Sequence, residues 1–216
     1  VAAPSDVLKA LIAEHWRWWL ERHPESATSL DVREFDDRIS DLGLAQQDRD
    51  AADALRFQQR LKAIDDAGLS ASERVDKAVL DRLLDEQVQA VRHGQRMMLF
   101  TSYASWYQNF AGIADSLPFR ARADFDSYLK RLALFPAQNR EAIAITRKAV
   151  QAGFVQPCAS LGQLERSARG VIAERPEQSR FYAPFLGRRP ADMTESDWTA
   201  AQARAKALIS DVLDPE

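Results

Sequence analysis

The chain has 216 residues, of which 46% are hydrophobic and 28% are charged, with 8 glycines and 9 prolines. This composition is typical of an ordered globular protein. The formal net charge is -3, and the two signs are interleaved along the chain. That pattern argues against a nucleic-acid-binding or anionic-membrane surface, because both require a clustered basic face.

A single cysteine, Cys158, rules out an intramolecular disulfide and a cysteine-based metal cage within the chain. No apolar run reaches the roughly 18 residues that a membrane span requires, so no transmembrane segment is expected. The sequence begins VAAPSD without an initiator Met, which fits signal-peptide cleavage and equally a trimmed chain. These residues constrain the compartment only weakly, so a periplasmic or envelope-associated location and a cytoplasmic location both remain open at this point.

The first predicted helix can be capped by Ser5 and ends before Pro24. Trp18 lies off its apolar stripe, so the sequence predicts a helix that is buried on two sides. Apolar residues at spacings of three and four define the stripe: Leu8, Leu11, Ile12, Trp16, Trp19 and Leu20.

Residues 31–44 are polar and predict a loop or a short helical turn. A second helix is predicted over residues 45–67, and a third begins at the capping box formed by Ser70 and Glu73. The apolar pattern continues this third helix to about Phe100. The connection between the two helices is short, so we expect them to form an antiparallel hairpin.

In the second half of the chain, Asp124 can cap a fourth helix, which Pro136 either kinks or divides. Pro157 suits the first turn of a further helix. After an irregular loop, Thr194 and Asp197 form a capping box for the last helix. No segment shows the sustained two-residue alternation of a strand. The sequence therefore predicts an all-α fold, with about seven helices in an irregular antiparallel array that is part of a larger helical fold.

The stretch 97–119 differs from the rest of the chain, because Asp115 is its only charged residue. A soluble protein places such a segment in its core or along the wall of a cleft, and both interpretations remain open. Phenol, indole and amide side chains can grip a peptide backbone or a sugar while stacking on apolar groups. The candidate substrate-binding residues are therefore Tyr103, Trp106, Tyr107, Gln108 and Asn109.

The sequence assigns no catalytic residue and no metal ligand. The three histidines, His15, His23 and His93, lie in neither an HExxH nor a Glu-x-x-His pattern, so a zinc or di-iron site within this chain is not expected. There is no Gly-rich phosphate loop, no GxSxG and no dinucleotide fingerprint.

Five stretches, taken together in their order and spacing, carry a resemblance to a known family. They are HPESATSL (23–30), DFDSYLKRLALFP (124–136), QAGFVQP (151–157), FYAPF (181–185) and ISDVLDP (209–215). The chain resembles the N-terminal half of the bacterial domain-of-unknown-function 885 family over about residues 11–215. One departure is Asp31, which stands where the family pattern commonly has a glycine.

The resemblance implies a largely helical, zincin-like metallopeptidase that is often exported and sometimes a lipoprotein. It also implies that the zinc and its His-Glu motif belong to a C-terminal half outside residues 1–216, so no cofactor is expected in this chain. On this hypothesis, residues 1–216 are one helical region, the N-terminal portion of a longer protein. They form one wall of the substrate cleft, with the catalytic half and a peptide substrate as partners, and they are inactive alone.

A second hypothesis is a non-enzymatic helical binding or scaffold domain. In that case the aromatic stretch receives a peptide, a glycan fragment or a partner helix. The two hypotheses differ in whether a zinc-bearing half accompanies this chain.

Overall fold

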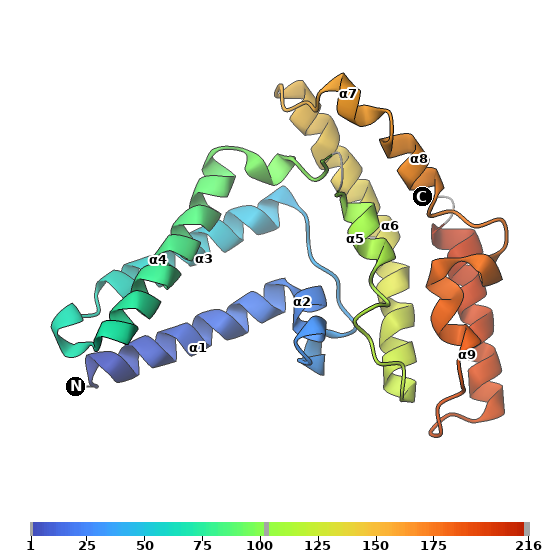
Figure 1. Ribbon diagram of the computed structural model, residues 1–216, viewed down its shortest axis with the longest axis horizontal. Helices are drawn as coiled ribbons and strands as arrows, with labels where there is room; N and C mark the ends of the chain where they lie inside the picture. Colours follow the sequence, from blue (N-terminus) through green and yellow to red (C-terminus); the bar gives the residue numbers. More distant parts are fainter. Residues whose placement is uncertain (1, 102–103, 214–216) are drawn as a thin grey trace. The chain divides into compact units, whose positions relative to one another are not determined.

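The computed structural model describes residues 2–101 and 104–213, and over these ranges the chain is helical (Figure 1). These ranges contain nine α-helices, some of them joined by short 3-10 turns, and α9 (Glu195–Leu208) is followed by a π-helical turn at Ile209–Leu213. The one β-bridge in the described residues, between Phe100 and Ser105, belongs to no sheet. The all-α prediction is confirmed. None of the described helices is long and apolar enough to cross a membrane.

The chain divides into two compact units. The first contains residues 1–22 and 42–98, and the second contains residues 23–41 and 99–216. That residues 1–216 act as one region of a longer protein stays a prediction.

The first unit is built from α1 (Pro4–Arg22), α3 (Leu44–Lys62) and α4 (Ala71–Arg92). Helices α3 and α4 pack side by side as the predicted hairpin, joined through a 3-10 turn at Asp66–Gly68 (Figure 1). The predicted capping box starts α4: the amide of Glu73 donates to Ser70 Oγ, and the amide of Ser70 donates to Glu73 Oε2. The core consists of Leu8, Leu11, Ala54, Phe57, Leu61, Ile64, Leu69, Leu80 and Leu84.

Two expectations for this unit are corrected. Helix α4 ends at Arg92 rather than near Phe100, because Gly94 adopts a left-handed conformation (φ 74°) that ends the helix. Helix α1 is not buried on both sides, since Trp16 is 47% exposed. Trp16 stacks on Trp19 at 5.3 Å, while Trp18 packs edge-on against Phe57.

The second unit is organised around the 30-residue helix α6 (Arg122–Gln151). Helices α5 (Trp106–Ala111) and α9 (Glu195–Leu208) pack on it. A 3-10 segment at Arg180–Leu186 inserts the FYAPF aromatics into the core. The core includes Phe110, Ile113, Leu117, Phe125, Tyr128, Leu129, Leu132, Phe135, Phe181, Tyr182, Phe185, Met193 and Trp198.

Helix α6 differs in one detail from its prediction, and of the two alternatives at Pro136 it excludes division into two helices. Asp124 is not the N-cap residue: it lies in the first turn, and its Oδ2 accepts hydrogen bonds from the amides of Arg120 and Ala121. The helix also continues through Pro136 without a new start. Proline lacks an N–H, so the carbonyl four residues earlier loses its usual donor, but the neighbouring turns hold the helix together.

Arg131 on α6 anchors the segment that contains α2 (Pro24–Ser29) and the 3-10 turn Arg33–Phe35. Its guanidinium is fully buried. Nε donates to the carbonyl of Arg38 at 2.8 Å, and Nη2 donates to Thr28 Oγ1 at 2.7 Å. Burial lowers the pKa of Arg131. This buried cation therefore ties residues 23–41 to α6.

Candidate functional site

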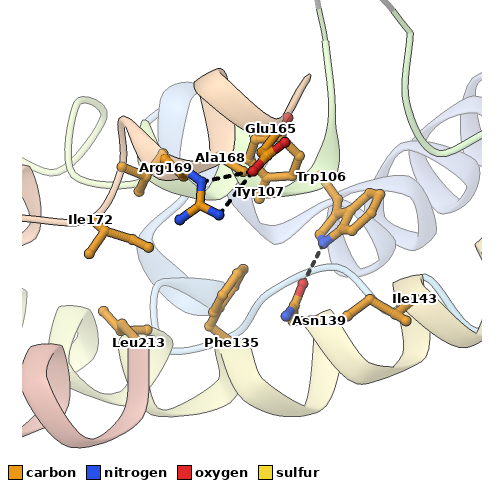
Figure 2. A pocket seen from close by; sticks show the side chains of 11 residues that line it. Trp106, Tyr107, Phe135, Asn139, Ile143, Glu165, Ala168, Arg169, Ile172 and Leu213 are labelled. Carbon is orange, nitrogen blue, oxygen red and sulfur yellow. Dashed lines mark hydrogen bonds and ion pairs between the residues drawn. The ribbon is translucent and has the colours of Figure 1, made fainter. Parts of the chain in front are cut away.

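A cavity of about 440 Å³ lies in the second unit, between α5, α6 and the short helix α8 (Leu164–Arg169) (Figure 2). This volume is within the range of small-molecule and side-chain pockets. Its lining is mostly apolar and consists of Trp106, Tyr107, Phe135, Asn139, Ile143, Glu165, Ala168, Arg169, Val171, Ile172 and Leu213.

One wall of the cavity comes from the start of α5. Ser105 caps this helix, because its hydroxyl accepts a hydrogen bond from the amide of Gln108. The cap places Trp106 at the first helical position, where its ring packs edge-on against Tyr107 at 5.5 Å. The two rings therefore enter the site from a defined helix end rather than from a loop.

The floor is one face of α6. Phe135, Asn139 and Ile143 are spaced four residues apart, so their side chains lie on the same side of the helix. The indole Nε1 of Trp106 donates to Oδ1 of Asn139 at 2.8 Å (Figure 2). Asn139 is only 5% exposed. The hydrogen bond gives its buried amide oxygen a donor in an otherwise apolar pocket.

The third wall is α8, which is tied to α5 by a hydrogen bond of 2.6 Å from Gln108 Nε2 to Ser167 Oγ. This link holds the helix that carries Glu165 and Arg169 beside the cavity. Glu165 Oε1 accepts from both Nε and Nη2 of Arg169, at 3.0 and 2.9 Å (Figure 2). The charged side chains that line the cavity are therefore this one exposed ion pair, and most of the other lining residues are apolar.

The Tyr107 hydroxyl is a second feature of this site. It is buried and makes no hydrogen bond with the residues that the structure describes. A buried hydroxyl without a partner costs about 1–3 kcal/mol. Such groups are uncommon in native proteins, so this hydroxyl is available to a ligand in the cavity.

A family model described as "Bacterial protein of unknown function (DUF885)" matches residues 24–216. The chain belongs to the DUF885 family. The match includes every residue that lines the cavity and confirms the family resemblance seen in the sequence. A search of curated proteins found no match to this chain.

The five predicted binding residues of this DUF885 chain are not brought to one place. Trp106 and Tyr107 line the cavity. Gln108 does not line the cavity, and it donates a hydrogen bond to Ser167 on α8. Asn109 lines a separate, more polar hollow together with Asp115. Tyr103 lies outside the described residues. That these residues bind a substrate stays a prediction.

Sequence reasoning did not find Phe135, Asn139, Glu165 or Arg169. Phe135 and Asn139 flank Pro136 in a helix that seemed to be interrupted there, so their shared face was not visible. Glu165 and Arg169 form an ordinary i,i+4 pair on a helix that was expected to be longer. Chain folding alone brings them next to the aromatic stretch.

A second apolar hollow, of about 710 Å³, lies in the first unit between α1 and α4. Trp16, Trp19, Val79 and Leu83 line it together with His15. The His15 pKa is lowered because the ring is half-buried. The ring packs edge-on against Phe57 at 5.3 Å, which is a structural role rather than a ligand role.

The zinc implied by the DUF885 resemblance does not fit the residues of this chain. Among residues 2–101 and 104–213, no group of three or more His, Cys, Asp or Glu side chains could hold a metal ion. Structural and catalytic zinc sites need at least three such protein ligands.

Proposed function

We propose that this DUF885 chain binds peptides, and that the cavity between α5, α6 and α8 takes one apolar side chain of the bound peptide. The observation that carries the proposal is the cavity itself: about 440 Å³, with apolar walls from three elements and few polar groups. Burying a Leu, Met or Phe side chain in such a site contributes about 1.5–3 kcal/mol.

A peptide suits the site better than a glycan fragment does. Sugar recognition requires several free hydrogen-bonding groups, but the amides near the cavity are already engaged within the protein. Asn139 accepts from Trp106, and Gln108 donates to Ser167. What the cavity offers a ligand is therefore apolar contact area, the Tyr107 hydroxyl and one ion pair at its edge.

In the finer form of the proposal, this helical region is one wall of the substrate cleft of a zinc-dependent peptidase. The zinc ligands and the catalytic groups would belong to sequence outside residues 1–216, and this chain alone would hydrolyse nothing. Membership in DUF885 supports this form only through the zincin-like character that the sequence resemblance implies for the family. A periplasmic or envelope location would suit such an enzyme.

A peptide-binding domain without enzymatic activity is the alternative, and it uses the same cavity. Zinc content and native mass separate the two. The peptidase form predicts a native protein well above 24.3 kDa with about one zinc per chain. A metal-free native protein with a mass near 24.3 kDa would favour the peptide-binding domain without enzymatic activity.

The cavity is tested directly by filling it. Ala168 on α8 and Ala159 on α7 (Cys158–Leu161) are both exposed, but only Ala168 lines the cavity. N-acetyl-phenylalaninamide has roughly 15 non-hydrogen atoms, and about -0.3 kcal/mol per atom corresponds to a Kd of about 0.5 mM. We expect Ala168→Phe to weaken its binding at least tenfold in a calorimetric titration.

The control variant, Ala159→Phe, should bind this ligand as the unmodified protein does. Equal binding by the two variants would place the ligand elsewhere on the molecule. Absence of binding to the unmodified protein at millimolar concentrations would contradict the proposed function.

A further inference from the structure

We propose that Arg169 recognises a ligand carboxylate, so that the cavity selects peptides whose apolar residue is the C-terminal one. This inference rests on the proposed function and names the part of the peptide that binds. Figure 2 shows the Arg169 guanidinium reaching into the cavity from α8, across from Phe135 and Leu213. A peptide whose side chain packs on the floor formed by α6 would have its backbone beside the guanidinium.

Arg169 retains free hydrogen-bonding capacity. Its Nε and Nη2 both donate to the single oxygen Oε1 of Glu165. Within the part of the chain that the structure describes, Nη1 donates to no protein acceptor. A guanidinium has five N–H donors in a planar fork. Arg169 can therefore donate hydrogen bonds from its Nη1 edge to an incoming carboxylate.

The existing partner of Arg169 is easily replaced. The Glu165 and Arg169 side chains are 77% and 74% exposed, and an exposed i,i+4 pair contributes only about 0.3–0.5 kcal/mol. A carboxylate held at the cavity mouth by an anchored apolar side chain competes with Glu165 at high effective concentration. Bidentate contact between an arginine and a carboxylate is also among the stronger hydrogen-bonding arrangements.

The cavity can recognise an apolar side chain and a carboxylate on the same ligand residue. The apolar floor on α6 and the cation on α8 face the same space, which suits an α-carboxylate one bond away from the carbon that bears the apolar side chain. Arg169 is the one basic residue among those that line the cavity. If the ligand bound in the opposite orientation, its amine would contact Glu165. The Arg169 guanidinium would then lie over the floor without a hydrogen-bond acceptor from the ligand.

The test compares three phenylalanine derivatives in calorimetric titrations of the intact protein at low ionic strength. They are N-acetyl-phenylalanine, N-acetyl-phenylalaninamide and phenylalaninamide, which present a carboxylate, no charge and an amine. We expect the carboxylate ligand to bind about tenfold more tightly than the neutral amide. This preference should shrink at high salt, because exposed charges are screened.

Three variants identify the residue. Arg169→Gln should abolish the preference for the carboxylate, so that the acid and the neutral amide bind this variant with similar affinity. Arg166→Gln removes an exposed arginine from the same helix that does not line the cavity, so the preference should persist. Glu165→Gln removes the competing carboxylate and should raise affinity for N-acetyl-phenylalanine several-fold.

The outcomes are distinguishable. If the acid and the amide bind equally and Ala168→Phe weakens both, the cavity binds apolar side chains but the inference about Arg169 is wrong. Tighter binding of phenylalaninamide, lost in Glu165→Gln, would also overturn it in favour of an amine. If none of the three ligands binds, the proposed function fails together with the inference.

Discussion

Trp106 and Asn139 are joined by a hydrogen bond of 2.8 Å from the indole Nε1 to the amide Oδ1, which connects the start of α5 to the middle of α6. The two residues are 33 positions apart in the sequence, and their contact sets one corner of the cavity. Because Asn139 is almost fully buried, this hydrogen bond contributes both to stability and to the shape of the site.

Replacing Asn139 by Leu should destabilise the protein by about 1–3 kcal/mol, because the indole N–H of Trp106 would lose its acceptor within the protein. Urea denaturation followed by circular dichroism measures the loss. Glu141→Ala, at an exposed position of the same helix, should change stability by less than about 0.5 kcal/mol. A loss of that small size in Asn139→Leu would show that the hydrogen bond contributes little.

Replacing Arg131 by Met should cost about 3 kcal/mol or more. The carbonyls of Arg38 and Phe35 and the hydroxyl of Thr28 would lose a buried donor together. The adjacent Lys130 offers a matched control, since its ion pair with Asp37 at 3.2 Å is exposed. Lys130→Met should cost less than about 1 kcal/mol. Similar losses in the two variants would contradict the structural role assigned to Arg131.

His15 should make the first unit less stable in mild acid. Burial lowers its pKa in the folded state, so the unfolded chain binds a proton more readily, and protonation favours unfolding as pH falls below about 6.5. The contribution of neutral His15 is complete above that pH and is lost progressively below it. His15→Phe keeps the ring contact with Phe57 and removes the titration.

Chemical denaturation at pH 7 and pH 5 tests this pH dependence. The unmodified protein should lose more stability between the two pH values than His15→Phe does. Parallel losses would show that other groups carry the pH dependence.

Most of the fold could be predicted from local sequence signals. The capping boxes at Ser70 and Thr194 are intrinsic to four-residue segments, and both form as predicted. The errors occurred where the local signal was ambiguous: Gly94 ends α4 earlier than the apolar pattern indicated, and the helix expected after Pro157 is two short helices, with Gly162 ending the first. A backbone conformation that depends on one glycine is difficult to distinguish from a tolerated helical glycine.

The candidate site could be predicted only in part. Trp106 and Tyr107 stood out because they lie in an almost uncharged aromatic stretch. Asn139 and Arg169 did not, because a polar residue on a charged helix carries no sign of which residues it will meet. Their roles depend on contacts between segments more than 30 positions apart in sequence, and the sequence pattern does not contain that information.

The central claim, that an apolar side chain enters the cavity between α5, α6 and α8, is tested most directly by locating the ligand. We would measure intermolecular nuclear Overhauser effects between N-acetyl-phenylalanine and the isotope-labelled protein. The account predicts contacts from the ligand ring to the Trp106 indole and the Ile143 methyl groups, both lost in Ala168→Phe. Contacts confined to the hollow around Trp16 and Leu83, or no contacts at saturating ligand, would contradict the account.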